Sequence, residues 1–191
     1  MEVVKLSQRA VNKAIIAIKN GKVVVFPTDT VYGFLAGASD KKAVENIFKI
    51  KKRLKSKPLA VFVRDFKMAE ELAYIDKSQK KVLKKYWPGK YTFVLKVKKG
   101  NNLCKLVIKD NAIALRIPKY KPLNNLLKKI NKPLDQTSVN ISGKPPLTKI
   151  GDIIKQFEKS DILIIDAGNL PKSKSSAIID LTKNKIKILR K

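Results

Sequence analysis

Apolar side chains recur every three to four residues in two early stretches of the chain, which is the period of a helix that buries one face. Ser7 precedes the first stretch and Asp40 precedes the second, and both residue types cap helix N-termini through a side-chain oxygen. Gly21 ends the first predicted helix. The inward-facing positions are Val11, Ala14, Ile15 and Ile18 in the first helix and Val44, Ile47 and Phe48 in the second.

Short apolar runs bounded by turn residues predict strands between and after these helices. The predicted strands cover residues 22–26, 59–63, 91–97, 112–117, 162–166, 176–180 and 185–189, and another strand runs into a loop over residues 135–143. Further helices are predicted over residues 68–74, 79–86, 122–130 and 150–157. Because helices and strands alternate early and strands cluster late, we expect an α/β fold with a mixed sheet in a single domain, residues 1–191.

Charge adds a class of partner to this picture. The chain carries 43 Lys and Arg against 15 Asp and Glu, a formal net charge of +28, and such a potential attracts nucleotides and polyanions. Arg is rare among the cations, although its planar fork binds phosphate and carboxylate bidentately. The five arginines are therefore better candidates for a binding site than any single lysine: Arg9, Arg53, Arg64, Arg116 and Arg190.

Missing residue types exclude several kinds of chemistry. The sequence has no His and a single Cys, Cys104, which excludes a disulfide, a His/Cys zinc site and Ser-His-Asp catalysis. It also lacks a P-loop and a dinucleotide fingerprint. We find no apolar run long enough to span a membrane and no signal peptide, so we expect a cytoplasmic protein.

Two early motifs are candidates for a ligand site. PTDTVYG, residues 27–33, follows a predicted strand, and it is either a set of hydrogen-bonding groups at a sheet edge or a turn in which Asp29 binds its own backbone. Lys51 and Arg53 lie where a helix runs towards a strand, and they could converge on phosphates. In so basic a chain, a solvated face is the alternative for this second motif.

Four later features are weak when each is taken alone. SVNISG, residues 138–143, either points small polar groups in one direction or forms a turn. Arg116 stands within the apolar LRIP stretch and needs an anionic partner, which is either a ligand or an internal carboxylate. Arg190 would pass for part of a frayed tail, and WPGKYT, residues 87–92, is interpreted as a helix stop and a strand start.

The order of these motifs is more specific than any one of them. PTDTVYG, KxR followed by KPL, WPGxxT, LRIP, SxNxSG, a Ser before IID and a late LR together resemble the YrdC/TsaC family of threonylcarbamoyl-AMP synthases. The resemblance implies a twisted mixed sheet flanked by helices, with a large basic cavity. It also implies that L-threonine, bicarbonate or CO2, and ATP with Mg²⁺ form threonylcarbamoyl-AMP and pyrophosphate, and that partner proteins pass the threonylcarbamoyl group to tRNA.

The resemblance assigns roles by motif position. Lys51 and Arg53 are expected to be catalytic and to face the phosphates. The residues expected at the threonine are Thr30, Tyr32, Arg116 and Ser176, with Arg116 on the carboxylate. The residues expected at the nucleotide are Lys51, Arg53, Lys57, Ser138, Asn140 and Arg190. No side chain is expected to bind a metal directly.

Three positions depart from the family pattern. Leu54, Lys57 and Phe62 stand where the family commonly has Pro, Asn and His, so Phe62 cannot hydrogen-bond threonine. The loop after SxN often carries another Arg in the family, and here Lys144 or Lys149 is the available substitute.

Two other functions compete with the synthase. The first is a non-catalytic module that binds double-stranded RNA or tRNA in the same basic cavity, although the sequence shows no interleaved surface aromatic residues that would stack bases. The second is the related carbamoyl-transfer module of hydrogenase maturation, which sits beside Cys-rich zinc fingers. One Cys and no His leave no room for that arrangement.

Overall fold

The two early helices form where the sequence predicts them. In the computed structural model, which describes residues 1–183 and 186–191, the Ser7 hydroxyl accepts a hydrogen bond from the Ala10 N–H (3.1 Å) at the start of the first helix. The Asp40 carboxylate accepts one from the Ala43 N–H (3.0 Å) at the start of the second. The helices are α1 (Gln8–Lys19), α2 (Lys41–Lys51), α3 (Phe66–Leu72), α4 (Lys77–Tyr86), α5 (Lys121–Ile130) and α6 (Ile150–Phe157), with a 3-10 turn η1 (Lys105–Val107).

The described strands form one mixed sheet. They are β1 (Glu2–Lys5), β2 (Val23–Phe26), β3 (Gly33–Gly37), β4 (Ala60–Phe62), β5 (Tyr91–Lys96), β6 (Ile108–Lys109), β7 (Ala112–Arg116), β8 (Leu134–Ser138), β9 (Ile162–Asp166), β10 (Ala177–Asp180) and β11 (Lys187–Arg190). Their order is β1-β9-β2-β3-β8-β4-β7-β5-β10-β11, and β6 pairs with β7. The β5–β7 pair is antiparallel, while β2–β9 and β4–β7 are parallel.

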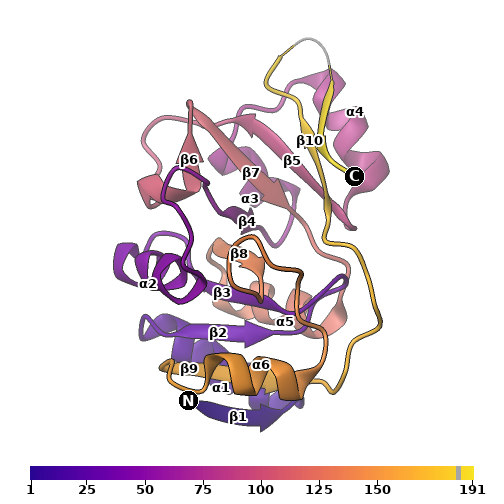
Figure 1. Ribbon diagram of the computed structural model, residues 1–191. Helices are drawn as coiled ribbons and strands as arrows, with labels where there is room; N and C mark the ends of the chain where they lie inside the picture. The colour runs from indigo at the N-terminus through magenta and orange to yellow at the C-terminus, as the bar shows by residue number, and fades with distance from the viewer. Residues whose placement is uncertain (184–185) are drawn as a thin grey trace.

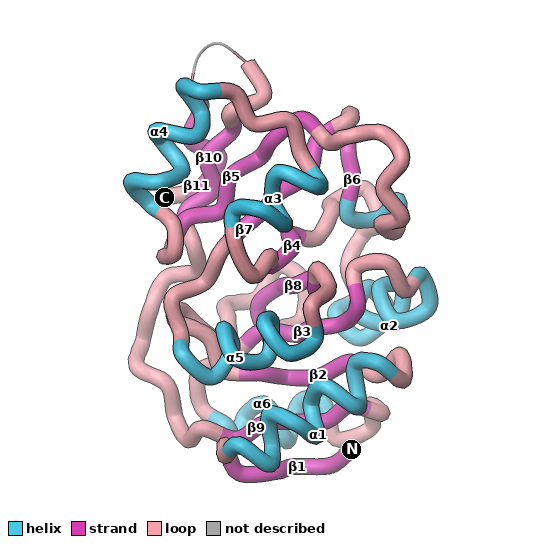
Figure 2. Tube along the Cα trace, turned by 180° about the vertical axis from the view of Figure 1, so that it is seen from behind, coloured by secondary structure: helices cyan, strands magenta, loops and turns pink. Residues whose placement is uncertain are grey.

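Helices cover both faces of this sheet. Helices α1 and α5 pack together on one face, where Leu126 and Leu127 join Ala14 and Ile18 in a buried cluster (Figure 2). Helices α2 and α6 lie on the opposite face, in front of β2, β3 and β9 in Figure 1. Because side chains alternate along a strand, each strand between these layers is buried on both sides.

The structure confirms the predicted helices and most strands, with ends shifted by a few residues, and it adds strands that the sequence did not predict. β3 has glycine at both ends, and β1 mixes Val with charged residues, so neither shows the β-branched run on which the prediction relied. Both strands are held by pairing, since β3 lies between β2 and β8 and β1 lies along β9. The predicted strand at 185–189 corresponds to β11, and Lys185 lies outside the described residues.

The sheet also provides the floor of a cavity. Ala60, Ala114 and Gln136 lie on β4, β7 and β8 and line it. Phe62 lies two residues after Ala60 on β4, and Leu134 lies two residues before Gln136 on β8. Both side chains belong to the buried cluster between α1, α5 and the sheet. By the alternation of a strand, the cavity and that cluster therefore occupy the same face of the sheet.

Candidate active site

Most of the predicted site residues meet at this cavity, although their sequence positions span the whole chain. It encloses about 260 Å³. Seven of the ten predicted residues line it: Thr30, Tyr32, Arg53, Arg116, Ser138, Ser176 and Arg190. Three of these are arginines, and no Asp or Glu occurs among the lining residues in the described part of the chain. The arrangement favours an anionic ligand.

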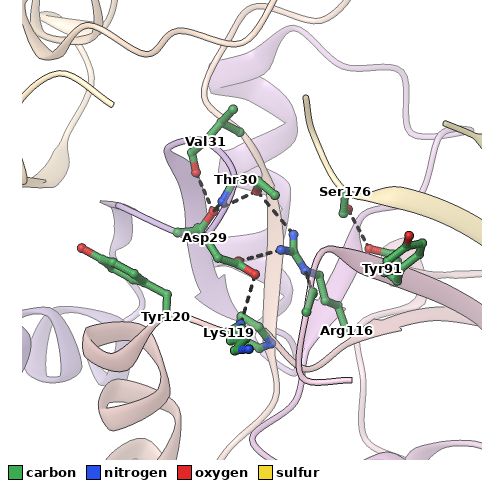
Figure 3. A network of polar contacts seen from close by, with 12 residues as sticks. Asp29, Thr30, Val31, Tyr91, Arg116, Lys119, Tyr120 and Ser176 are labelled. Atoms are coloured by element: carbon green, nitrogen blue, oxygen red, sulfur yellow. Dashed lines mark hydrogen bonds and ion pairs between the residues drawn. The ribbon is translucent and has the colours of Figure 1, made fainter. Parts of the chain in front are cut away.

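Arg116 at the end of β7 is held by an internal ion pair. Its Nη2 lies 2.6 Å from Asp29 Oδ1, its Nε donates to the Gly89 carbonyl at 2.9 Å, and its Nη1 lies 3.4 Å from the Thr30 hydroxyl (Figure 3). Only 2% of Arg116 is exposed, and burial lowers its pKa while the Asp29 carboxylate opposes that effect. Phe62 lies beneath the guanidinium, with 5.5 Å between Cζ and the ring centroid. The internal partner is therefore present, and three of the five N–H hydrogens of Arg116 are engaged.

The two threonines of the PTDTVYG loop extend this network in one direction. The Thr28 hydroxyl donates to the Val31 carbonyl at 2.7 Å, so towards Thr30 it can only accept. The Thr30 hydroxyl therefore donates to Thr28 and accepts from Arg116. The loop is a turn closed by Thr28, and Thr28 and Thr30 border the cavity. The alternative in which Asp29 binds its own backbone is wrong, because the Asp29 carboxylate accepts from Arg116 and from the Lys119 N–H (3.1 Å) instead.

Tyr32 borders the cavity, and its fully buried side chain belongs to the core. The hydroxyl donates to the Gly168 carbonyl at 2.7 Å and accepts from the Ala167 N–H at 2.9 Å. Burial raises its pKa to about 12. Donation from this hydroxyl to threonine would therefore require it to leave the Gly168 carbonyl.

Lys51 at the end of α2 points away from the cavity and binds the loop that follows β8. Its Nζ donates to the carbonyls of Ser138 (2.5 Å) and Asn140 (2.9 Å) and to Asn140 Oδ1 (2.8 Å). These acceptors match the three N–H hydrogens of an ammonium group. Burial, and then Arg53, lower its pKa to about 7. Direct phosphate contact stays a prediction, and it requires Lys51 to exchange one of these partners.

Asn140 is likewise engaged within the loop. Its amide donates to the carbonyls of Ile141 (3.0 Å) and Lys144 (2.5 Å), and its Oδ1 accepts from the Ser138 hydroxyl at 2.8 Å. Of the residues in SVNISG, Ser138 lines the cavity and Asn140 does not. Lys51 and Asn140 therefore shape the loop, whereas Ser138 borders the space that a ligand would occupy.

The loop between α2 and β4 places Arg53 at the cavity edge. Arg53 Nε donates to the Lys57 carbonyl at 2.8 Å and Nη2 donates to the Pro58 carbonyl at 3.0 Å. Burial and the neighbouring Arg190 lower the pKa of Arg53. The Lys57 side chain is exposed and lies outside the lining, so its contribution here is the backbone carbonyl that orients Arg53. The Lys57 nucleotide contact stays a prediction.

The strand β11 contributes Leu189 and Arg190 to the cavity lining. Arg190 on β11 donates to the Ser176 carbonyl through Nε (2.9 Å) and Nη2 (2.7 Å), and the Ser176 hydroxyl shares a hydrogen bond with the Thr92 hydroxyl at 2.8 Å. Burial lowers the pKa of Arg190. Arg190 therefore fixes the entry into β10 and adds positive charge to the cavity.

Sequence reasoning missed several partners in this site. Asp29 stood inside a motif already singled out, and an internal carboxylate was one of the two alternatives for Arg116, but the sequence did not identify Asp29 as that carboxylate. Gly89 belongs to WPGKYT, which was interpreted as architecture alone, yet its carbonyl orients Arg116. Thr92 ends the same motif, but its hydrogen bond to Ser176 depends on the pairing of β5 with β10, which the motif does not reveal.

Among residues 1–183 and 186–191, no helix is both long and apolar enough to cross a membrane. Over the same residues, no group of three or more His, Cys, Asp or Glu side chains is arranged to hold a metal ion.

Comparisons with known proteins identify the family of this chain. The family model described as telomere recombination (Sua5/YciO/YrdC) matches residues 16–191. A putative threonylcarbamoyl-AMP synthase of Methanocaldococcus jannaschii is 40% identical over 91% of this chain and 81% of its own length. The crystal structure of Pyrococcus abyssi Sua5 complexed with L-threonine has a TM-score of 0.89 and 32% identity, and the match covers 99% of this chain and 56% of that one.

The family also contains proteins whose names state no activity. Escherichia coli YciO, an uncharacterized protein, is 31% identical over 92% of this chain and 85% of its own length. Its crystal structure has a TM-score of 0.89 at 27% identity, covering 100% of this chain and 94% of that one. The chain spans about half the length of the Pyrococcus abyssi threonylcarbamoyl-AMP synthase (48%), which is 35% identical over 86% of this chain. On the match over residues 16–191 and these relatives, the chain belongs to the Sua5/YciO/YrdC family.

Proposed function

We propose that this protein is a threonylcarbamoyl-AMP synthase, a nucleotidyltransferase that joins L-threonine, bicarbonate or CO2, and ATP and releases pyrophosphate. The observation that carries the proposal is the cavity itself. Arg116, Thr30 and Ser176 line one region and Arg53 and Ser138 another, so one space offers groups for both an amino acid and a nucleotide. The names of the relatives support the same activity.

Threonine would bind where Arg116 is preorganised. Two of the five guanidinium N–H hydrogens are left after the bonds to Asp29, Gly89 and Thr30, and a carboxylate accepts such a pair of donors. Asp29 would hold the fork in place without binding the substrate. Because Phe62 is fully buried beneath Arg116, the group that contacts the threonine side chain would come from Thr30 or Ser176 instead.

The chemistry needs no protein nucleophile. The threonine amine adds to CO2 and loses a proton, which gives a carbamate. A carbamate oxygen then attacks the α-phosphorus, and the bond between this phosphorus and the bridging oxygen of the leaving pyrophosphate breaks. Arg53 and Arg190 would stabilise the charge that develops on the phosphates, and fixed cations in a partly dry site are effective at this task.

Mg²⁺ is proposed as a companion of the triphosphate. The lining residues in the described ranges include no carboxylate, so this chain supplies no anionic ligand for the ion and the ATP oxygens would provide them. A divalent ion bound in this way neutralises phosphate charge, and the protein residues orient the nucleotide around it.

Substrate entry requires β11 to move. A volume of about 260 Å³ lies below the range of roughly 300–1,000 Å³ for sites that hold a drug-sized molecule. Leu189 and Arg190 line the cavity from this strand, and β11 pairs only with β10 among the described strands. We therefore assign to β11 the role of a flap that Arg190 closes on Ser176.

The test is pyrophosphate release by purified protein with ATP, Mg²⁺, bicarbonate and L-threonine. We expect release that depends on threonine, and Arg53→Ala should reduce it strongly, whereas Arg9→Ala on an exposed helix face should leave it unchanged. Folded wild-type protein that releases no pyrophosphate in response to threonine would refute the proposed activity.

A further inference from the structure

A second pocket lies beside the cavity and is built from different elements. It encloses about 480 Å³ between the end of α4, the turn into β5 and the segment that leads into β10. We call it the tyrosine–lysine pocket, and its lining residues are Lys85, Tyr86, Gly89, Lys90, Tyr91, Ser173, Lys174, Ser175 and Ala177. Ser175 lines both this pocket and the cavity, so only the Ser173–Ser176 segment separates the two spaces.

The charge of this pocket sets it apart from the other surface hollows. Lysines are everywhere in a chain of net charge +28, so three of them alone carry little information. Three other hollows of the described surface each contain at least one acidic residue. The first contains Glu2 and Asp161, the second contains Asp161, and the third contains Asp40. Within the described residues the tyrosine–lysine pocket has none. The pocket therefore favours an anion through its own lining residues as well as through the net charge of the whole chain.

Two aromatic rings form one wall. The Tyr86 and Tyr91 centroids lie 4.4 Å apart at 48°, and both rings pack inwards on Phe93 at 6.1 Å and 6.5 Å. Lys85 Nζ lies 5.7 Å from the Tyr86 centroid. The Tyr91 carbonyl accepts from Trp87 Nε1 at 2.8 Å, which fixes the turn. The rings are half-buried, so each is anchored on the inside and lines the pocket on the outside.

We propose that the tyrosine–lysine pocket binds a nucleotide unit of single-stranded RNA, with a base against the tyrosine rings and the adjoining phosphates on Lys85, Lys90 and Lys174. Aromatic faces beside a positively charged track are the physical basis of single-strand binding. Duplex RNA keeps its bases stacked and offers them no such contact. The inference does not rest on the proposed synthase activity, because none of the three lysines lines the cavity.

This pocket also corrects the expectation that the surface lacks aromatic residues for stacking. The two tyrosines fall in a predicted helix and a predicted strand, and Lys174 lies far from both in sequence. Only the parallel pairing of β5 with β10, in which the Ala177 N–H donates to the Lys90 carbonyl at 3.0 Å, brings the three segments together.

The test is fluorescence anisotropy with a labelled ten-nucleotide single-stranded RNA of mixed sequence, across a series of salt concentrations. The Lys85→Gln/Lys90→Gln/Lys174→Gln variant should weaken binding and lower the slope of log affinity against log salt by about 2, since each phosphate contact on a single strand contributes about 0.7. The control variant removes the same charge from exposed lysines elsewhere, at Lys42, Lys105 and Lys128. It should leave the slope unchanged.

The aromatic wall is tested separately. Tyr91→Leu should weaken single-strand binding about tenfold without changing the salt slope, because stacking and not charge is lost. Far-ultraviolet circular dichroism checks that each variant is folded. If Tyr91→Leu does not fold, the two lysine variants still test the proposal. The proposal would be overturned if both triple variants lost the same binding affinity, or if a ten-base-pair RNA duplex bound as tightly as the single strand. It would also be overturned if AMP at equal nucleotide concentration displaced the single strand completely.

Discussion

Replacing Lys51 by methionine removes the ammonium group that holds the loop after β8. Two effects of opposite sign follow. The Ser138 and Asn140 carbonyls each lose the Lys51 donor, whereas Asn140 Oδ1 keeps the Ser138 hydroxyl, and each buried acceptor left unsatisfied costs about 1–3 kcal/mol. The variant also avoids burying an ammonium whose pKa falls from its usual 10.5 to about 7, because burial and Arg53 disfavour the charge. A pKa difference of about 3.5 corresponds to about 5 kcal/mol.

The sign of the pH dependence follows from this depressed pKa. The unfolded chain binds the proton more tightly than the folded chain, so the contribution of Lys51 to stability is present above pH 10.5 and is lost as the pH falls through about 7. Between pH 7 and pH 9.5, the free energy of unfolding of the wild type should therefore rise by about 3 kcal/mol relative to Lys51→Met.

The assay is urea denaturation of both proteins at several pH values in this range. Lys49→Met on the same helix is the control, because Lys49 is exposed and its removal should give a difference from the wild type that does not change with pH. A Lys51→Met difference that is equally flat would refute the reasoning. In the synthase assay, Lys51→Met should raise the KM for ATP through the displaced loop.

Three other substitutions test neighbouring parts of the account. Asp135 on β8 is fully buried, and neither of its carboxylate oxygens has a hydrogen-bond partner among the described residues. Burial raises its pKa well above the usual value, so its stabilising contribution exists at acid pH and is lost as the pH rises. Asp135→Val should therefore raise the free energy of unfolding at pH 7 by about 1–3 kcal/mol, with a smaller gain near pH 3, and a gain independent of pH would contradict this. Asp29→Asn should cost about 3 kcal/mol in the same measurement and raise the KM for threonine, because Arg116 keeps its buried charge without a counterion, whereas Asp161→Asn in an exposed pair should cost under about 1 kcal/mol. Arg190→Gln should raise the KM for ATP about tenfold by removing two charged hydrogen bonds to Ser176, and an effect no larger than that of Lys191→Gln would argue against the flap.

Local sequence signals predicted the elements that depend on local interactions. Ser7 and Asp40 cap their helices as expected, because a cap needs only the next three residues. The strand β3 pairs with β2, which directly precedes it, and with β8, which lies far along the chain, and no local pattern encoded it. The order of motifs predicted most of the residues that meet at the cavity, including Arg53, which follows a helix and not a strand.

Side-chain direction was beyond that reasoning. Lys51 and Arg53 stand two positions apart, yet one turns into the loop after β8 and the other lines the cavity, because Lys51 ends α2 whereas Arg53 follows the left-handed residue Lys52. The sequence also did not predict that a carboxylate would be buried without a hydrogen-bond partner. Asp135 is polar in the sequence but occupies a strand position that faces the core, between Ala36 and Val61 on the neighbouring strands.

The most direct test of the central claim is detection of the adenylate itself. Wild-type protein is incubated with ATP, Mg²⁺, L-threonine and isotope-labelled bicarbonate, and the products are separated and identified by mass spectrometry. The account predicts labelled threonylcarbamoyl-AMP in equal amount to pyrophosphate, and its loss when threonine is omitted. Folded protein that yields no labelled adenylate would contradict it.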